Sequence, residues 1–78
     1  MENNIENRIK NVMAAVFGLT VDEIHDDASP DTIESWDSLK HMNLIIALEE
    51  EFNIVIPDDE VGNMLTFGLV LFIVHEAI

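Results

Sequence analysis

Cysteine is absent from this 78-residue chain, so neither a disulfide nor a cysteine-based zinc site can stabilise it. Basic residues are scarce: three Lys and Arg stand against sixteen Asp and Glu, which gives a net charge of −13. A field of this sign disfavours binding to nucleic acid and attracts partners with basic surfaces. The longest apolar run, Leu69 to Val74, is too short to span a membrane.

The length allows one domain at most, which we place over residues 1–78. Hydrophobic residues make up 49% of the chain, which is too many for an acidic disordered segment. The first residues are polar and acidic, unlike the basic start and apolar run of a signal peptide. We therefore expect a cytoplasmic protein without a membrane span, and a monomer.

Apolar periodicity and capping residues predict an all-α fold of three main helices, one short helix and a long first connection. The predicted helices run from Asn4 to Phe17 (ended by Gly18), from Ser38 to Phe52, briefly after Pro57, and from Phe67 to about Ala77 after a Thr66 cap. In the connection, Thr20 and Glu23 form a capping-box pattern, and Ile33 is the residue placed to anchor the acidic loop. The acids of that loop do not have the spacing of a calcium-binding loop.

Each helix has residues that we expect to face inward. On the second helix we expect an inward stripe of Leu39, Met42, Ile46 and Phe52, broadened by Leu44, Ile45, Ala47 and Leu48. Val61, Met64 and Leu65 form the apolar side of the short helix region. On the last helix, one face comprises Phe67, Val70, Leu71, Val74 and Ile78, while Leu69, Phe72 and Ile73 fall partly outside it. The surplus is either an extension of the core or a contact patch.

The start of the second helix is the candidate functional site. Trp36 precedes the helix and is placed to staple the chain entry, and Asp37 is a good N-cap. Ser38 is then the first helical residue, where backbone amides and the helix dipole stabilise an attached phosphate. A serine hydrolase built from Asp37, Ser38 and His41 would also need an oxyanion site and a substrate pocket, and an N-cap Asp37 would point away from His41.

The run Asp37-Ser38-Leu39, the acidic helix end Leu48 to Phe52, and the Ile56-Pro57-Asp58 turn together resemble the acyl carrier protein family. The resemblance covers nearly the whole chain. It implies that Ser38 receives 4'-phosphopantetheine from coenzyme A, and that Asp37 is recognised by the holo-acyl-carrier-protein synthase (a phosphopantetheinyl transferase) that makes the transfer. The arm would hold acyl groups as thioesters, and the protein itself would not be an enzyme and would have no metal site of its own.

The resemblance also implies an acyl pocket and a docking surface for enzymes with basic patches. The pocket candidates are Met42, Ile46, Ile56, Val61, Leu65 and Leu71, and the partner-contact candidates are Leu39, Lys40, Asn43, Glu49 and Glu50. Lys40, His41 and Asn43 are less acidic than is typical of fatty-acid carriers, so we interpret the chain as a specialised member. Aminoacyl, peptidyl and D-alanyl carriers share the serine chemistry and stay open, as does an unmodified acidic helical interaction module.

Overall fold

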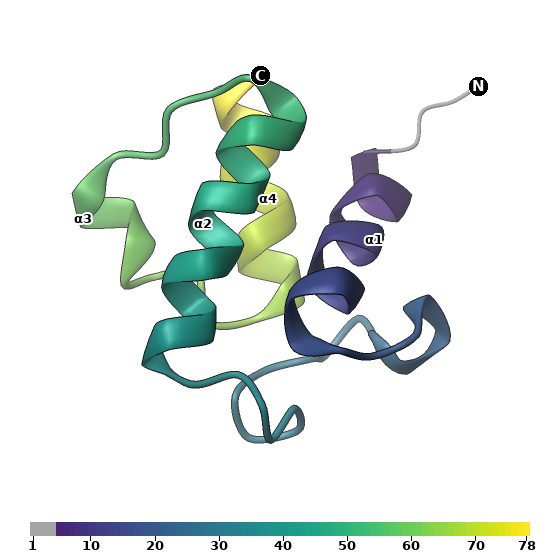
Figure 1. Cartoon of the computed structure of the whole chain (residues 1–78). Coiled ribbons are helices and arrows are strands. Elements are labelled where there is room, and N and C mark those ends of the chain that lie inside the picture. The colour runs from purple at the N-terminus through teal and green to yellow at the C-terminus, as the bar shows by residue number, and fades with distance from the viewer. Residues whose placement is uncertain (1–4) are drawn as a thin grey trace.

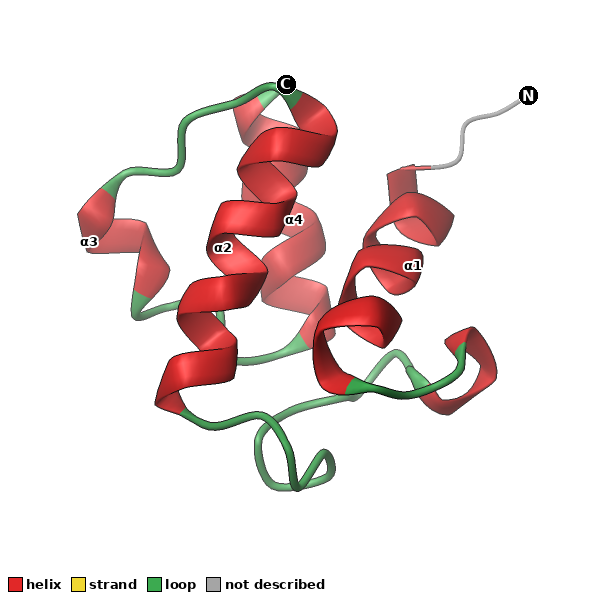
Figure 2. Cartoon of the chain, viewed as in Figure 1, coloured by secondary structure: helices red, strands yellow, loops and turns green. Residues whose placement is uncertain are grey.

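The computed structural model describes residues 5–78, which form four α-helices and one short 3-10 helix, with no strand among these residues. The helices are α1 (Ile5–Phe17), η1 (Val21–Glu23), α2 (Ser38–Phe52), α3 (Asp58–Val61) and α4 (Phe67–Ala77). This arrangement confirms the predicted all-α bundle with a long first connection (Figures 1 and 2). The predicted start of the first helix at Asn4 lies outside the described residues. None of the helices described is both long and apolar enough to cross a membrane.

α1 packs against both α2 and α4, and its end is set by a glycine. Gly18 has φ of +71°, a left-handed conformation that L side chains rarely adopt, and the Leu19 N–H then donates to the Ala14 carbonyl across 2.9 Å. The predicted capping box follows, because the Thr20 N–H donates to a Glu23 carboxylate oxygen at 2.8 Å. α1 therefore ends where the sequence indicates.

The long connection between α1 and α2 is held to the core by a few buried side chains. Ile24, Ala28, Ile33 and Trp36 are all buried, which confirms the predicted anchor at Ile33. The Phe67 N–H donates to the Ala28 carbonyl across 2.9 Å, so the connection is also tied to the start of α4. The loop passes beneath the helices in Figure 1 and delivers the chain to the first residue of α2.

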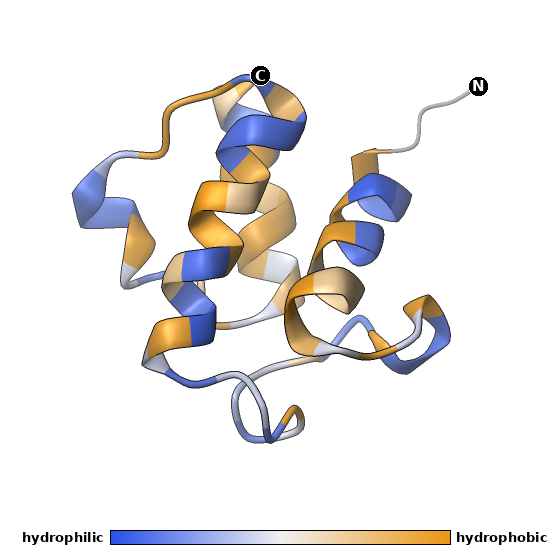
Figure 3. Cartoon of the chain, viewed as in Figure 1, coloured by the Kyte–Doolittle hydropathy of each residue, from blue (hydrophilic) through white to orange (hydrophobic). Residues whose placement is uncertain are grey.

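The predicted inward face of α2 is partly right. Leu44, Ile45 and Leu48 are buried and Phe52 packs against the core as expected, but Leu39, Met42 and Ile46 do not face inward. The buried residues of α2 are His41, Leu44, Ile45 and Leu48, which share one face at three- and four-residue spacing. Leu39, Met42 and Ile46 lie on another face and are 69%, 49% and 52% exposed. Figure 3 shows that hydrophobic residues occupy much of both α2 and α4, so hydropathy alone does not distinguish their inner and outer faces.

Two smaller corrections concern the C-terminal half. On α4, Phe67, Val70 and Val74 are buried as predicted, but Ile73 is buried too, whereas Ile78 is 64% exposed. In the α3 region Met64 is fully buried, while Leu65 is 45% exposed. The Thr66 hydroxyl accepts a hydrogen bond from the Leu69 N–H at 3.1 Å, which confirms the predicted cap of α4. The exposure of Leu65 matters for the site beside it.

Candidate functional site

The start of α2 is fixed by the backbone and side chain of Asp37. Asp37 is extended, with φ of −106° and ψ of −174°, and its Oδ1 accepts a hydrogen bond from the Lys40 N–H at 2.8 Å. Its carbonyl oxygen accepts the His41 N–H, also at 2.8 Å. These bonds confirm Asp37 as the N-cap and make Ser38 the first residue of the helix. The Ser38 side chain is consequently placed at the positive end of a four-turn helix.

Ser38 differs from the other two serines of the chain. Ser35 is half-buried, and its hydroxyl donates to the Phe17 carbonyl at 3.1 Å. Ser29 is also half-buried, and its hydroxyl oxygen accepts from the Asp31 N–H at 3.2 Å. Ser38 is exposed, and among the hydrogen bonds of residues 5–78 its hydroxyl has no protein partner. It is therefore the serine whose oxygen is most accessible to another molecule.

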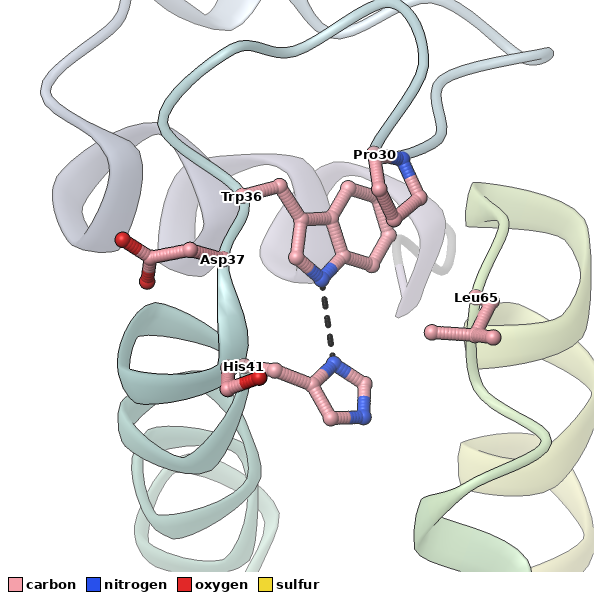
Figure 4. A pocket seen from close by; sticks show the side chains of 6 residues that line it. Pro30, Trp36, Asp37, His41 and Leu65 are labelled. Carbon is pink, nitrogen blue, oxygen red and sulfur yellow. Dashed lines mark hydrogen bonds between the residues drawn. The ribbon is translucent and has the colours of Figure 1, made fainter.

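The rings of Trp36 and His41 form a buried pair that lines the same pocket as Ser38. Trp36 is only 4% exposed and packs on Phe17, with ring centroids 5.0 Å apart. Its indole N–H donates to Nδ1 of His41 across 3.0 Å, as Figure 4 shows. An indole N–H can only donate, so Nδ1 is the accepting nitrogen, and Nε2–H of His41 donates to the Val61 carbonyl at 2.8 Å. The predicted anchoring by Trp36 is confirmed, but the sequence reading missed the bridge through His41.

The hydrogen bonds of His41 also bear on the hydrolase alternative. Both ring nitrogens are already engaged, one with Trp36 and the other with Val61, so neither is available to take a proton from Ser38. The Asp37 carboxylate is turned toward the helix amides rather than toward the imidazole. Asp37, Ser38 and His41 are thus neighbours that do not assemble into a nucleophile, base and orienting acid.

A pocket of about 340 Å³ opens beside Ser38 and is lined mainly by apolar surface. Its walls come from three parts of the chain (Figure 4): the lining residues are Pro30, Trp36, Asp37, Ser38, His41 and Leu65. Of the six predicted pocket residues, only Leu65 is among them. Ile56 is buried, Val61 and Leu71 are partly buried, and Met42 and Ile46 are exposed on the outer face of α2. This pocket therefore has a different lining from the predicted acyl pocket, whose residues stay a prediction.

The outer face of α2 presents an exposed apolar stripe that begins next to Ser38. Leu39, Met42 and Ile46 follow one another at helical spacing, so their side chains share one side of the helix. Asn43 and Glu50 are exposed and Lys40 is half-buried. A partner that approaches Ser38 along α2 would meet this stripe together with polar and acidic neighbours.

Glu49, predicted as a partner contact, has a structural role. Its Oε2 accepts the Ile56 N–H at 2.8 Å, and its carbonyl oxygen accepts the Asn53 and Ile54 N–H groups at the end of α2. Asn53 takes the left-handed conformation there, with φ of 55°. The Glu49 carboxylate therefore fixes the turn between α2 and the Ile56 segment, and it is only partly available to a partner.

A small helical bundle with an exposed serine at the N-terminus of α2 is an arrangement that suits a carrier of a covalently attached group. A family model described as "Phosphopantetheine attachment site" matches residues 7–66, which is more than half of the chain. The chain belongs to this phosphopantetheine-binding family, and its prosthetic group is 4'-phosphopantetheine. The match includes most of α1, all of α2 and α3, and every residue that lines the Ser38 pocket.

The residues around Ser38 fit such a group. A phosphodiester on Ser38 Oγ would lie at the positive end of α2, and the exposure of Ser38 leaves room for a transferase to reach it. The apolar pocket beside it offers a surface for the part of the arm or cargo nearest the attachment point. When bound, the group supplies a thiol, which a chain without cysteine otherwise lacks.

Proposed function

We propose that the protein is an acyl carrier that is modified on Ser38 and delivers thioester-linked acyl groups to enzymes of fatty-acid, polyketide or related lipid or secondary-metabolite synthesis. The observation that supports this most strongly is the contrast among the three serines. Ser38 is exposed at the start of α2, whereas the hydroxyls of Ser29 and Ser35 take part in hydrogen bonds of the fold.

The modification is a phosphoryl transfer in which Ser38 Oγ is the nucleophile. Ser38 Oγ forms a bond to the phosphorus that carries the pantetheine unit in coenzyme A, the bond to the adenosine bisphosphate portion breaks, and the hydroxyl proton passes to a base. That base belongs to the separate transferase, because both nitrogens of His41 are occupied. Asp37 holds the helix start in place for the transferase, and Ser38 is exposed there.

Once modified, the chain acts by presentation and not by catalysis. Tethering raises the effective concentration of the cargo at each enzyme that binds the carrier. We assign docking to the outer face of α2, where Leu39, Met42 and Ile46 give apolar contact area and the net charge of −13 steers enzymes with basic patches. Glu50 adds an exposed carboxylate at the far end of this face.

An aminoacyl or peptidyl cargo, including D-alanine, uses the same serine chemistry and is the second candidate. The lining of the pocket favours the acyl alternative, because its apolar walls offer little to solvate an ammonium group. The Asp37 carboxylate is the one charged group of the lining, and it already accepts a backbone N–H.

The test is to incubate the protein with coenzyme A, magnesium and a broad-range phosphopantetheinyl transferase, and then to measure its mass. We expect a gain of one phosphopantetheine, which Ser38→Ala abolishes and Ser35→Ala retains. An unmodified helical interaction module would show no gain under the same conditions. Loading the holo protein with acyl-activating and aminoacyl-activating enzymes then separates the two cargo classes.

A further inference from the structure

His41 joins three parts of the structure directly behind the attachment point. Its side chain leaves the inner face of α2, its Nδ1 accepts from Trp36 in the segment before α2, and its Nε2 donates to the carbonyl of Val61 at the end of α3. The imidazole lies nearly parallel to the indole, with ring centroids 6.1 Å apart and an angle of 22° between the planes. His41 also forms a wall of the pocket beside Ser38.

We propose that His41 is a gate that limits the acyl group taken into this pocket to a short chain. This rests on the proposed function, because it concerns cargo attached through Ser38. A chain entering between Ser38 and Leu65 meets the imidazole and the indole. To continue between α2 and α3, it has to displace an imidazole that is hydrogen-bonded at both nitrogens.

Displacing the ring is unfavourable for reasons visible in the contacts. The Trp36 N–H would lose its acceptor in a site where Trp36 is 4% exposed, and the Val61 carbonyl would keep only the longer bond from the Met64 N–H, at 3.3 Å. Trp36 and His41 both line this pocket, so their rings bound the space that a chain can enter from Ser38. The methylene groups beyond a short chain therefore stay outside the gate.

Trp36 provides the readout, because it is the only tryptophan in the sequence and its indole N–H is hydrogen-bonded to His41. The holo protein is loaded with acetyl, butanoyl, hexanoyl, decanoyl and hexadecanoyl groups, with loading verified by mass. The indole N–H resonance is then followed in a nitrogen–proton correlation spectrum. We expect it to shift progressively over the short members and to stay constant from the medium-length members onward.

Two results would overturn the gate. In one, the indole shift keeps growing through hexadecanoyl; in the other, no acyl group shifts the indole resonance although loading is complete. A protein that gains no mass from coenzyme A instead contradicts the proposed function, so the two failures are distinguishable. The wild-type series decides the matter even if a His41 variant folds poorly.

The His41→Ala variant tests the assignment of the gate to this residue. Removing the ring opens the path between α2 and α3, so we expect the indole shift to keep changing with longer chains, and the plateau to disappear. His75→Ala, at an exposed histidine of α4, is the matched control and keeps the wild-type plateau. A folded His41→Ala protein with the wild-type plateau contradicts the gate.

Discussion

Trp36 and His41 are joined by a hydrogen bond of 3.0 Å between the indole Nε1 and the imidazole Nδ1, five residues apart across the start of α2. The bond ties the end of the long connection to the inner face of the helix that begins with Ser38. Because His41 also donates to the Val61 carbonyl, one side chain links the segment before α2, α2 itself and α3 next to Ser38. The stability of the fold and the shape of the site therefore depend on the same residue.

Replacing His41 by Ala is expected to lower the free energy of unfolding by about 2 kcal/mol, because the buried Trp36 N–H loses its acceptor and the Val61 carbonyl keeps only the bond from the Met64 N–H. Urea unfolding followed by Trp36 fluorescence measures this loss. His25→Ala and His75→Ala replace exposed histidines and should stay within ~0.5 kcal/mol of wild type. Equal effects at all three positions would show that the bridge contributes nothing specific.

The Asp37 cap is tested by comparing two substitutions. Asp37→Ala removes the acceptor of the Lys40 N–H and should lower the unfolding free energy by about 1 kcal/mol. Asp37→Asn keeps an oxygen that can cap, so its loss should be smaller. Thermal unfolding of the three proteins gives the comparison, and an Asn variant as unstable as the Ala variant would argue against the capping role.

Glu49 and Glu50 are neighbours with different expected effects. Glu49→Gln weakens the bond to the Ile56 N–H, and Glu49→Ala removes it, with an expected destabilisation of about 1 kcal/mol. Glu50 is exposed, so Glu50→Ala should stay within ~0.5 kcal/mol in stability. If Glu50→Ala instead destabilises the fold as much as Glu49→Ala, the assignment of the structural carboxylate is wrong.

The positions of the helices were predictable because each has a local signal. Gly18, Asp37 and Thr66 stop or cap their helices as their chemistry requires, and the backbone shows each of them in that role. The placement of Ser38 at the start of α2 follows from the Asp37 cap. These features depend on residues close in sequence, and that is why periodicity and capping rules were sufficient to predict them.

The inner face of α2 could not be chosen from periodicity, because two faces are apolar. Leu44, Ile45 and Leu48 make one helical stripe, and Leu39, Met42 and Ile46 make another. What decides between them is His41, a polar residue that turns inward because Trp36 and Val61 satisfy its nitrogens. Such a partnership depends on tertiary contacts, so the part that Trp36 and His41 play in lining the pocket beside Ser38 could not be predicted from periodicity either.

The excess of acidic residues gives a prediction for salt. Among the described residues the ion pairs are Arg8 with Glu51 and Lys10 with Asp26, so most carboxylates repel one another without compensation. Sodium chloride should raise the melting temperature near neutral pH, since screening weakens that repulsion. Magnesium at equal ionic strength should raise it further. A melting temperature that is constant across salt would mean that the acids are better compensated than their charges indicate.

The account depends most directly on where phosphopantetheine becomes attached. The chain has three serines, and cleavage before Asp27, Asp31 and Asp37 places them on separate peptides, so peptide mass spectrometry after treatment with coenzyme A, magnesium and a broad-range transferase can assign the site. We predict that the added mass lies entirely on the peptide containing Ser38, that Ser38→Ala abolishes it, and that Ser29→Ala and Ser35→Ala retain it. Unmodified protein, or a mass gain that persists in Ser38→Ala, would contradict the central claim.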